Sequence, residues 1–325
     1  MIKAYSKLFR IPNVLMVGLT LVLMRYTIVA PMLAVYSMEL KLPFIAFLCY
    51  VLSTMLVAAA GYAINDYYDR DLDLVNRHKD DVIVGEKVPA PKVIMLYRIL
   101  NVVALVLAGY ASYKSGIFLL VICYPIMIGL LYFYTTTYKK QLLIGNLIVS
   151  LATALVPIAV YLYEIPPVMN HYKYYILSAP INLNVIGGWI LAFSAFAFLS
   201  GLSREIIKDM EDFEGDRFAG RNTVPIVWGM KWAKIISMLL LFAVIAGIAV
   251  LYYFFFFTAG MSDFISLVYF SVFLVIPLLY NLYQLYISKS VADYKFCGDL
   301  LKVIMLAGIF YAPIVWYILH KTFEI

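Results

Sequence analysis

Residues 52–73 read LSTMLVAAAGYAINDYYDRDLD, an apolar run that ends in a polar and acidic stretch. Residues 52–64 carry no charge, whereas four Asp and one Asn stand within residues 65–73. The whole chain has only 19 Asp and Glu among 325 residues, so this gathering of carboxylates is unusual. The apolar run is typical of a membrane-spanning helix. We therefore expect the carboxylates to lie at the end of a span.

The composition places the chain among membrane proteins. Hydrophobic residues make up 65% of it and charged residues 14%, against about 45–50% and about 25% in ordinary soluble domains. No Lys and Arg cluster of the kind found on nucleic-acid-binding domains occurs, so nucleic acid is not an expected partner. These features predict an all-α integral membrane protein in which residues 1–325 form a single transmembrane domain.

Nine stretches are long and apolar enough to cross the hydrocarbon core, which takes about 20 residues. They cover roughly residues 11–36, 43–64, 94–113, 117–137, 142–163, 185–206, 233–257, 263–287 and 300–319. Residues 164–184 are expected to form an outer loop between the fifth and sixth spans.

Lys and Arg residues fall mainly on one side of these predicted spans. With the N-terminus inside, 17 of the 25 lie in inner segments and 4 in outer segments. Since cytoplasmic loops carry the excess of positive charge, the N-terminus is expected in the cytoplasm and the chain in the cell (inner) membrane. The long inner segments 65–92 and 207–232 follow the second and sixth spans and share this side.

These two inner segments carry acidic motifs with one spacing. Three Asp at offsets 0, 3 and 7 occur in each, namely Asp66, Asp69 and Asp73, then Asp209, Asp212 and Asp216. At 3.6 residues per turn these offsets fall on one helix face, within an arc of about 60°. The spacing predicts two helices, each with a stripe of carboxylates at the cytoplasmic membrane edge, and Asn65 lies on the first stripe as a neutral ligand.

Stacked carboxylates repel one another unless cations lie between them. Mg²⁺ takes oxygen ligands, and typically a few carboxylates together with substrate phosphate oxygens bind it. Two facing stripes with two ions between them would hold a diphosphate. Basic side chains near this face would bind its remaining oxygens; the candidates are Arg70, Arg77, Lys139, Lys140, Arg204 and Lys208.

Other interpretations of the acidic motifs compete with this one. A single acidic run at a helix end is usually a solvated loop, but two runs with one spacing on one side argue against that interpretation. A cation-coupled transporter would also need carboxylates, although these tend to lie near the bilayer midplane. Here they lie at the inner rim.

The motifs NDYYDRDLD (65–73) and KDMEDFEGD (208–216) resemble those of the UbiA superfamily of intramembrane prenyltransferases, which has nine transmembrane helices. Smaller similarities are RIPN with Arg10 and Asn13, YKKQLLIGN with Lys139 and Asn146, and GRNTVPIVWG near Thr223. After the first motif the family often has an NRP-type stretch, whereas this chain reads NRHKDD.

The resemblance implies Mg²⁺-dependent prenyl transfer from a prenyl diphosphate to a lipophilic acceptor among membrane lipids. It also implies a substrate pocket that includes Arg10, Asn13 and Asn146, with Tyr132 and Tyr134 as aromatic candidates, although aromatic side chains in membrane bundles usually serve packing. The second motif is most similar to the branch that prenylates the hydroxyl of geranylgeranylglyceryl phosphate with a geranylgeranyl group. The alternative is prenylation of an aromatic acid, 4-hydroxybenzoate or 1,4-dihydroxy-2-naphthoate, in quinone synthesis.

Overall fold

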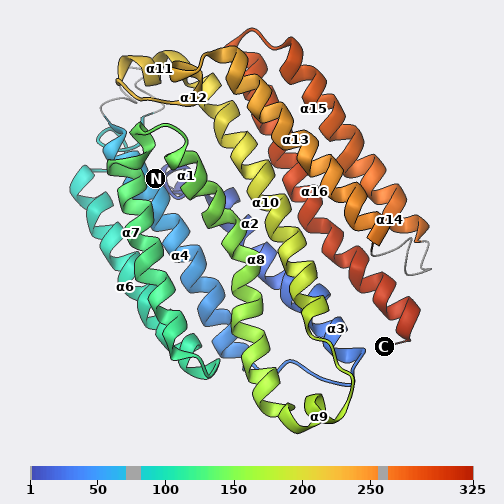
Figure 1. Ribbon diagram of the computed structural model, residues 1–325. Coiled ribbons are helices and arrows are strands. Elements are labelled where there is room, and N and C mark those ends of the chain that lie inside the picture. Colours follow the sequence, from blue (N-terminus) through green and yellow to red (C-terminus); the bar gives the residue numbers. More distant parts are fainter. Residues whose placement is uncertain (1, 71–81, 255–262, 325) are drawn as a thin grey trace. The chain divides into compact units, whose positions relative to one another are not determined.

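Figure 1 shows the computed structural model, which is built of helices. It describes residues 2–70, 82–254 and 263–324, and within these ranges the only strand-like pairing is an isolated bridge between Val84 and Val88. The elements run α1 (Ile2–Leu8), α2 (Ile11–Leu23), the π-helical turn η1 (Met24–Val29), α3 (Ala30–Ala34), α4 (Phe44–Tyr68), α6 (Ala90–Lys114), η3 (Phe118–Ile122), α7 (Cys123–Thr136), η4 (Tyr138–Lys140), α8 (Ile144–His171), α9 (Lys173–Ser178), α10 (Asn184–Glu211), α11 (Phe213–Phe218), α12 (Val224–Val227), α13 (Met230–Tyr252), α14 (Phe264–Tyr269), the π-helical turn η6 (Phe270–Val275), α15 (Ile276–Ile287) and α16 (Val291–Phe323).

The predicted nine spans are confirmed in the described part of the chain. Nine helical stretches there are long and apolar enough to cross a membrane. Their outward surfaces fit lipid, since large apolar side chains such as Val106 and Phe264 are 68% and 73% exposed. Soluble proteins rarely expose such side chains over large areas. The chain is therefore a multi-pass integral membrane protein.

Several predicted spans were shorter than the helices in the structure. Helix α4 continues to Tyr68 and α10 to Glu211, so both acidic motifs begin inside helices. The segment 164–184 was expected to be a loop, but α8 runs on to His171 and α9 follows it. Glu164, the first residue of the predicted loop, is fully buried inside the protein and lies within α8.

The helices divide into two compact units. Met1–Lys139 and Ala159–Leu183 form unit 1, whereas Lys140–Ile158 and Asn184–Ile325 form unit 2. Helix α8 therefore contributes residues to both units. That residues 1–325 form a single domain stays a prediction.

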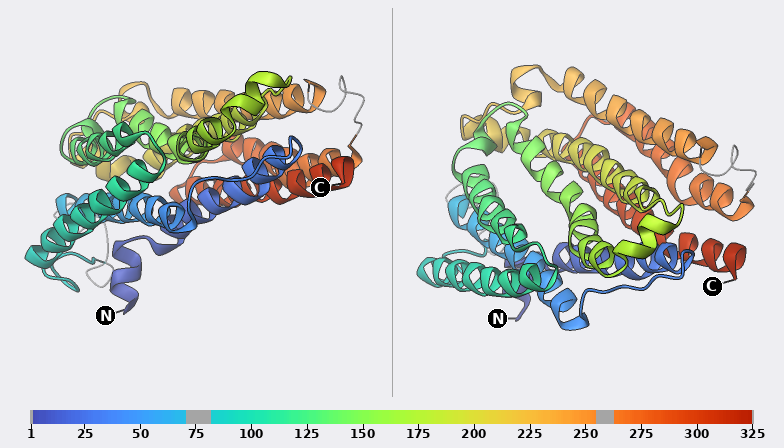
Figure 2. Two further views of the ribbon diagram at one scale, coloured as in Figure 1. Left: turned by 90° about the horizontal axis from the view of Figure 1, so that it is seen from below. Right: turned by 60° about the horizontal axis from the view of Figure 1, so that its bottom comes forward.

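In unit 1, α4 packs against α2, α6 and α7 (Figure 1). Near the end of α4, a small apolar cluster fixes α1 against it; the buried members are Ala4, Leu8, Ala63, Ile83, Val84, Val88 and Val93. Between α1 and α2 the backbone turns at Arg10, which has a left-handed φ of 46°. Figure 2 shows that α1 is set at an angle to α2. This turn brings the start of α2 to the end of α4.

In unit 2, α10 packs against α13 and α16, and α15 packs against both α13 and α16 (Figure 1). Small residues allow close approach between helices in a bilayer. At Gly201 of α10 an added Cβ would lie 3.3 Å from Thr153 Oγ1 and 3.8 Å from Ser150 on α8. The close approach at Gly201 therefore positions the beginning of α8 beside the acidic end of α10.

Candidate functional site

In both acidic motifs the helix is interrupted at the second Asp of the motif. Helix α4 ends at Tyr68 and α10 at Glu211, so the second carboxylate of each motif, Asp69 and Asp212, follows directly after the last helical residue. The amide of Asp69 still donates to the Asn65 carbonyl at 3.0 Å, and that of Asp212 to the Lys208 carbonyl at 2.9 Å. In the second motif Asp209 therefore lies in α10 and Asp216 in α11 (Phe213–Phe218), with Asp212 between the two helices. Asp73 of the first motif falls outside the described residues, so a single helix face there stays a prediction. Repulsion between carboxylates at i,i+3 and i,i+4 disfavours an uninterrupted helix here.

In unit 1 the first motif forms a compact polar group around Asp69. The Asn65 amide donates to Asp69 Oδ2 at 3.0 Å, and Asn65 is only 8% exposed. The Lys139 ammonium, which follows α7 in η4, donates to Asn65 Oδ1 at 3.2 Å and forms an ion pair with Asp69. The structure thus brings together three residues that the sequence predicted separately as metal and diphosphate ligands.

Asp66 meets the start of α2. The Arg10 guanidinium lies 3.3 Å from Asp66 Oδ1 and 4.8 Å from the centre of the Tyr62 ring. The Asn13 amide donates to the Tyr62 hydroxyl at 3.3 Å. Arg10 and Asn13 were predicted for the substrate pocket, and the structure places both beside the first motif. Tyr62 was not predicted, although its position four residues before Asp66 on a helix could have indicated it.

The remaining predicted residues of unit 1 lie around this group or outside the described ranges. Arg70 extends along the turn before α6, where an added Cβ on Gly85 would lie 3.5 Å from its Cδ. The Tyr132 hydroxyl lies 3.2 Å from that of Tyr68. Tyr134 is half-buried on α7. Asp73 and Arg77 fall outside the described residues.

In unit 2 the first carboxylate of the second motif is held by α8. The Asn146 amide donates to Asp209 Oδ2 at 2.8 Å, and Asn146 is 9% exposed. Lys208, Glu205 and Asp216 lie close enough to interact electrostatically with Asp209. Asn146 was predicted for the substrate pocket, whereas its observed partner is a carboxylate of the second motif.

The other carboxylates of this motif differ in exposure. Asp212 is exposed, while Asp216 is 4% exposed and pairs with Arg221, whose Nη1 lies 2.8 Å from Asp216 Oδ1. Arg221 was not predicted. Two of the remaining basic candidates of unit 2 lie on α10: Arg204 pairs with Glu205 at 2.9 Å, and Lys208 is half-buried. The third, Lys140, meets the segment after α11 through its backbone, since its carbonyl accepts from the backbone amide of Asn222 at 3.0 Å.

These donor sets fit Mg²⁺ when substrate supplies part of the coordination shell. No group of three or more His, Cys, Asp or Glu among the described residues is arranged to hold a metal ion by itself. Mg²⁺ usually keeps several waters and binds through one or two carboxylates plus phosphate oxygens, so a complete protein cage is not needed. Each unit offers hard carboxylate oxygens with a neighbouring amide, Asn65 in unit 1 and Asn146 in unit 2.

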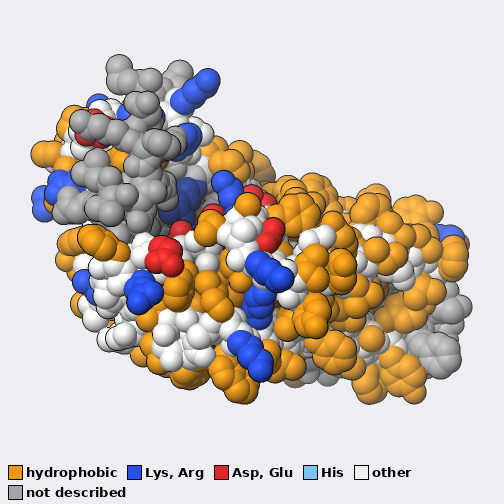
Figure 3. Space-filling model, turned by 90° about the horizontal axis from the view of Figure 1, so that it is seen from above, with side chains coloured by type: hydrophobic (Ala, Val, Ile, Leu, Met, Phe, Trp, Pro, Cys, Tyr) orange, Lys and Arg blue, Asp and Glu red, His pale blue; other side chains and the backbone are white. Residues whose placement is uncertain are grey.

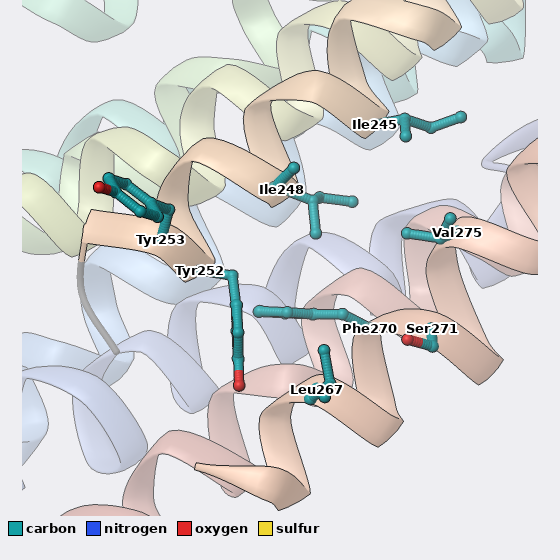
Figure 4. A pocket seen from close by; sticks show the side chains of 9 residues that line it. Ile245, Ile248, Tyr252, Tyr253, Leu267, Phe270, Ser271 and Val275 are labelled. Carbon is teal, nitrogen blue, oxygen red and sulfur yellow. The ribbon is translucent and has the colours of Figure 1, made fainter. Parts of the chain in front are cut away.

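Charged side chains are visible on the side from which α11 and α12 (Val224–Val227) are seen. Figure 3 gives this view and shows acidic and basic side chains among hydrophobic ones. A cavity of about 460 Å³ lies elsewhere, between α13 and the α14–η6 stretch. Figure 4 shows its apolar lining, including Ile245, Ile248, Leu267 and Phe270. No predicted site residue lines this cavity, so we exclude it as the candidate site.

Comparison with known proteins gives a family match over most of the chain. The model of the UbiA prenyltransferase family matches residues 24–306. A digeranylgeranylglyceryl phosphate synthase from Methanosphaera stadtmanae is 32% identical over 58% of this chain and 60% of its own length. The synthase of the same name from Thermococcus sibiricus is 32% identical over 57% of each chain. The chain thus spans less than two thirds of these curated relatives.

Solved structures share the fold. A structure of digeranylgeranylglyceryl phosphate synthase has a TM-score of 0.61 at 20% identity and covers 96% of this chain and 98% of that one. A UbiA homologue from Archaeoglobus fulgidus, bound to DMAPP and Mg²⁺, has a TM-score of 0.55 at 16% identity and covers 95% and 98%. At these identities the likeness establishes the nine-helix fold, as predicted from the sequence.

Proposed function

This chain belongs to the UbiA prenyltransferase family, and we propose that it transfers a prenyl group, geranylgeranyl, from its diphosphate to the hydroxyl of geranylgeranylglyceryl phosphate. The bond between the allylic carbon and the diphosphate oxygen breaks, an ether bond to the acceptor oxygen forms, and diphosphate and the hydroxyl proton are released. The acceptor is chosen because the curated relatives carry that synthase's name.

One observation carries the proposal more than any other. Both acidic motifs place carboxylates against cationic or amide side chains: Asp69 lies against Lys139 in unit 1, and Asp209 against Asn146 in unit 2. In such an arrangement the charged groups are already oriented before an anionic, metal-bound substrate binds. A solvated acidic loop would not need partners of this kind.

In this proposal two Mg²⁺ ions would be held by Asn65, Asp66 and Asp69 of unit 1 and by Asp209, Asp212 and Asp216 of unit 2, together with phosphate oxygens of the substrate. Bound Mg²⁺ would neutralise the charge that develops on the departing diphosphate. Lys139 and Arg10 already lie beside carboxylates of the first motif. Their donors are therefore placed to bind diphosphate oxygens near the same carboxylates, with Arg able to make two parallel hydrogen bonds.

The orientation and remaining ligands belong to the same proposal. The excess of Lys and Arg on one side supports a cytoplasmic N-terminus and a cytoplasmic site in the cell (inner) membrane. Prenyl diphosphate would arrive from that side, while the acceptor would enter from the lipid phase. Tyr68 and Tyr132, whose hydroxyls are 3.2 Å apart, are candidates for contact with the prenyl chain next to Asp69.

The test is an activity assay on the full chain purified in detergent. It is incubated with geranylgeranyl diphosphate and Mg²⁺, separately with geranylgeranylglyceryl phosphate, 4-hydroxybenzoate and 1,4-dihydroxy-2-naphthoate, and products are identified by mass spectrometry. We expect the ether product and stoichiometric diphosphate, both lost with EDTA and restored by Mg²⁺. Product from an aromatic acid alone would replace the acceptor that we propose. No product with any acceptor, together with ion uptake by vesicles that contain the protein, would favour a transporter.

A further inference from the structure

Asp216 is contacted by both the side chain and the backbone of Arg221, a residue that was not predicted from the sequence. The Arg221 guanidinium pairs with Asp216 Oδ1 at 2.8 Å, and the Arg221 amide donates to the Asp216 carbonyl at 3.0 Å. Both side chains are largely buried. Neither contact involves the other unit, because both residues lie in unit 2.

The local backbone explains why these two residues meet. Helix α11 ends at Phe218, with Ala219 as its C-cap, and Gly220 follows with a left-handed φ of 64°. The Gly220 amide donates to the Arg217 carbonyl at 3.2 Å, while the Arg221 amide reaches back to Asp216. These two bonds form a Schellman motif, which returns the residue after the glycine to the last turn of its helix. An apolar contact usually accompanies this motif, but here it is an Arg–Asp ion pair.

A buried carboxylate needs such a partner. Removing a charge from water is costly unless an opposite charge and hydrogen bonds compensate for it. Asp209 lies close enough to repel Asp216 electrostatically. The guanidinium therefore compensates the charge of the buried carboxylate and restrains its Oδ1 by a charge-assisted hydrogen bond.

We infer that Arg221 is a positioning residue, which orients Asp216 for binding of a divalent cation without itself contacting the cation. The inference rests on the proposed function, in which Asp216 is a metal ligand. Hydrogen-bond partners of metal-binding carboxylates typically contribute 10–100-fold to metal affinity. The same change in affinity is therefore expected here when Arg221 is replaced.

The chain offers a matched control for the loss of charge. Arg217 belongs to the same short helix and is exposed. Arg217→Gln removes one positive charge from the same segment without breaking the Asp216 pair. Arg221→Lys keeps the charge but not the planar guanidinium, so it tests the geometry of the contact.

The test is a Mn²⁺ titration of the purified full chain without substrate, with free Mn²⁺ measured by electron paramagnetic resonance. We expect Arg221→Gln to weaken Mn²⁺ binding about 10–100-fold, Arg221→Lys to have an intermediate effect, and Arg217→Gln to stay within about twofold of the wild type. In an Asp216→Asn background, Arg221→Gln should have no further effect, because the arginine acts through the carboxylate. Unchanged Mn²⁺ affinity in Arg221→Gln would overturn the inference.

Two further outcomes separate this inference from the proposed function. A normal Mn²⁺ affinity with a raised KM for prenyl diphosphate in Arg221→Gln would show that the arginine binds phosphate directly, and the inference fails while the function stands. A wild-type protein that binds no Mn²⁺ and forms no prenylated product would refute the function itself. Circular dichroism and gel filtration check the fold of each variant, and Arg221→Lys remains informative if Arg221→Gln does not fold.

Discussion

Arg25 and Glu164 form an ion pair inside unit 1, far from both acidic motifs in the sequence. Arg25 Nε lies 3.2 Å from Glu164 Oε1, and 4% and 0% of the two side chains are exposed. Arg25 Nη2 also donates to the Leu42 carbonyl at 2.8 Å, and its guanidinium lies 4.1 Å from the centre of the Phe47 ring. The pair joins the π-helical turn of the first span to the C-terminal part of α8.

Breaking this pair on one side should destabilise the protein. A buried charge left without its partner costs about 3–5 kcal/mol, whereas replacing both partners by apolar residues is often neutral or stabilising. We expect Arg25→Met and Glu164→Leu each to lower the unfolding temperature in detergent, and the double variant Arg25→Met/Glu164→Leu to recover most of the loss. If the double variant instead lowers the unfolding temperature by the sum of the two single effects, the two side chains are not coupled.

The carboxylate of Asp209 should be needed for turnover. In the proposed function it holds a metal ion, whose electrostatic contribution of several kcal/mol corresponds to a loss of about 100-fold or more. We expect this loss for Asp209→Asn, measured as the rate of diphosphate release. Glu214→Gln serves as a control, since Glu214 is exposed on the same segment. Equal activity of the two variants would argue against the metal role of Asp209.

Asn146 should affect activity through Asp209. The side-chain amide of Asn146 donates a hydrogen bond to a charged group, and such bonds contribute about 1.5–3 kcal/mol. Asn146→Leu should therefore lower kcat/KM by about 10–100-fold. Ser150→Ala is the control one turn later on α8, because the Ser150 hydroxyl bonds the main-chain carbonyl of Asn146 and not a carboxylate. If Ser150→Ala lowers kcat/KM as much as Asn146→Leu does, the cause is damage to helix packing and not the loss of the bond to Asp209.

Alanine should lower the stability of the folded protein at Gly220 and raise it at Gly247. Gly220 has φ 64°, and alanine in this region costs about 1–2 kcal/mol. Gly247 lies within α13 with nothing within 4 Å of an added Cβ, so alanine there should stabilise the protein by about 0.4–1 kcal/mol. Unfolding in detergent, followed by circular dichroism, measures both. A Gly220→Ala variant as stable as the wild type would contradict the backbone requirement at Gly220.

Much of the fold could be predicted because a bilayer constrains it strongly. Backbone groups in lipid must bond within their own helix, so runs of about 20 apolar residues indicate spans reliably. The boundaries were less predictable, since polar residues such as Asn65 and Asp66 still belong to α4. The fifth span was also predicted too short: Glu164 lies within α8, where its charge is compensated by the buried Arg25.

The candidate site could be predicted in its residue types but only partly in its contacts. The repeated Asp spacing indicated both motifs, and in the structure Lys139, predicted as a diphosphate ligand, forms an ion pair with Asp69 of the first motif. The helix breaks at Asp69 and Asp212 were not foreseen, because a period of 3.6 says nothing about where a helix ends. Arg221 could have been found from the glycine before it, which is typical of a helix C-terminus.

The sequence by itself determined the class of protein, the number of spans and the two acidic motifs, since these depend on local composition and spacing along the chain. Only the tertiary structure decided which side chain accompanies each carboxylate: Arg10 for Asp66, Lys139 for Asp69, Asn146 for Asp209 and Arg221 for Asp216. The physical reason is that three of these four partners lie on separate helices or turns. Packing and not sequence distance brings them within hydrogen-bonding reach, while the fourth depends on the left-handed backbone at Gly220.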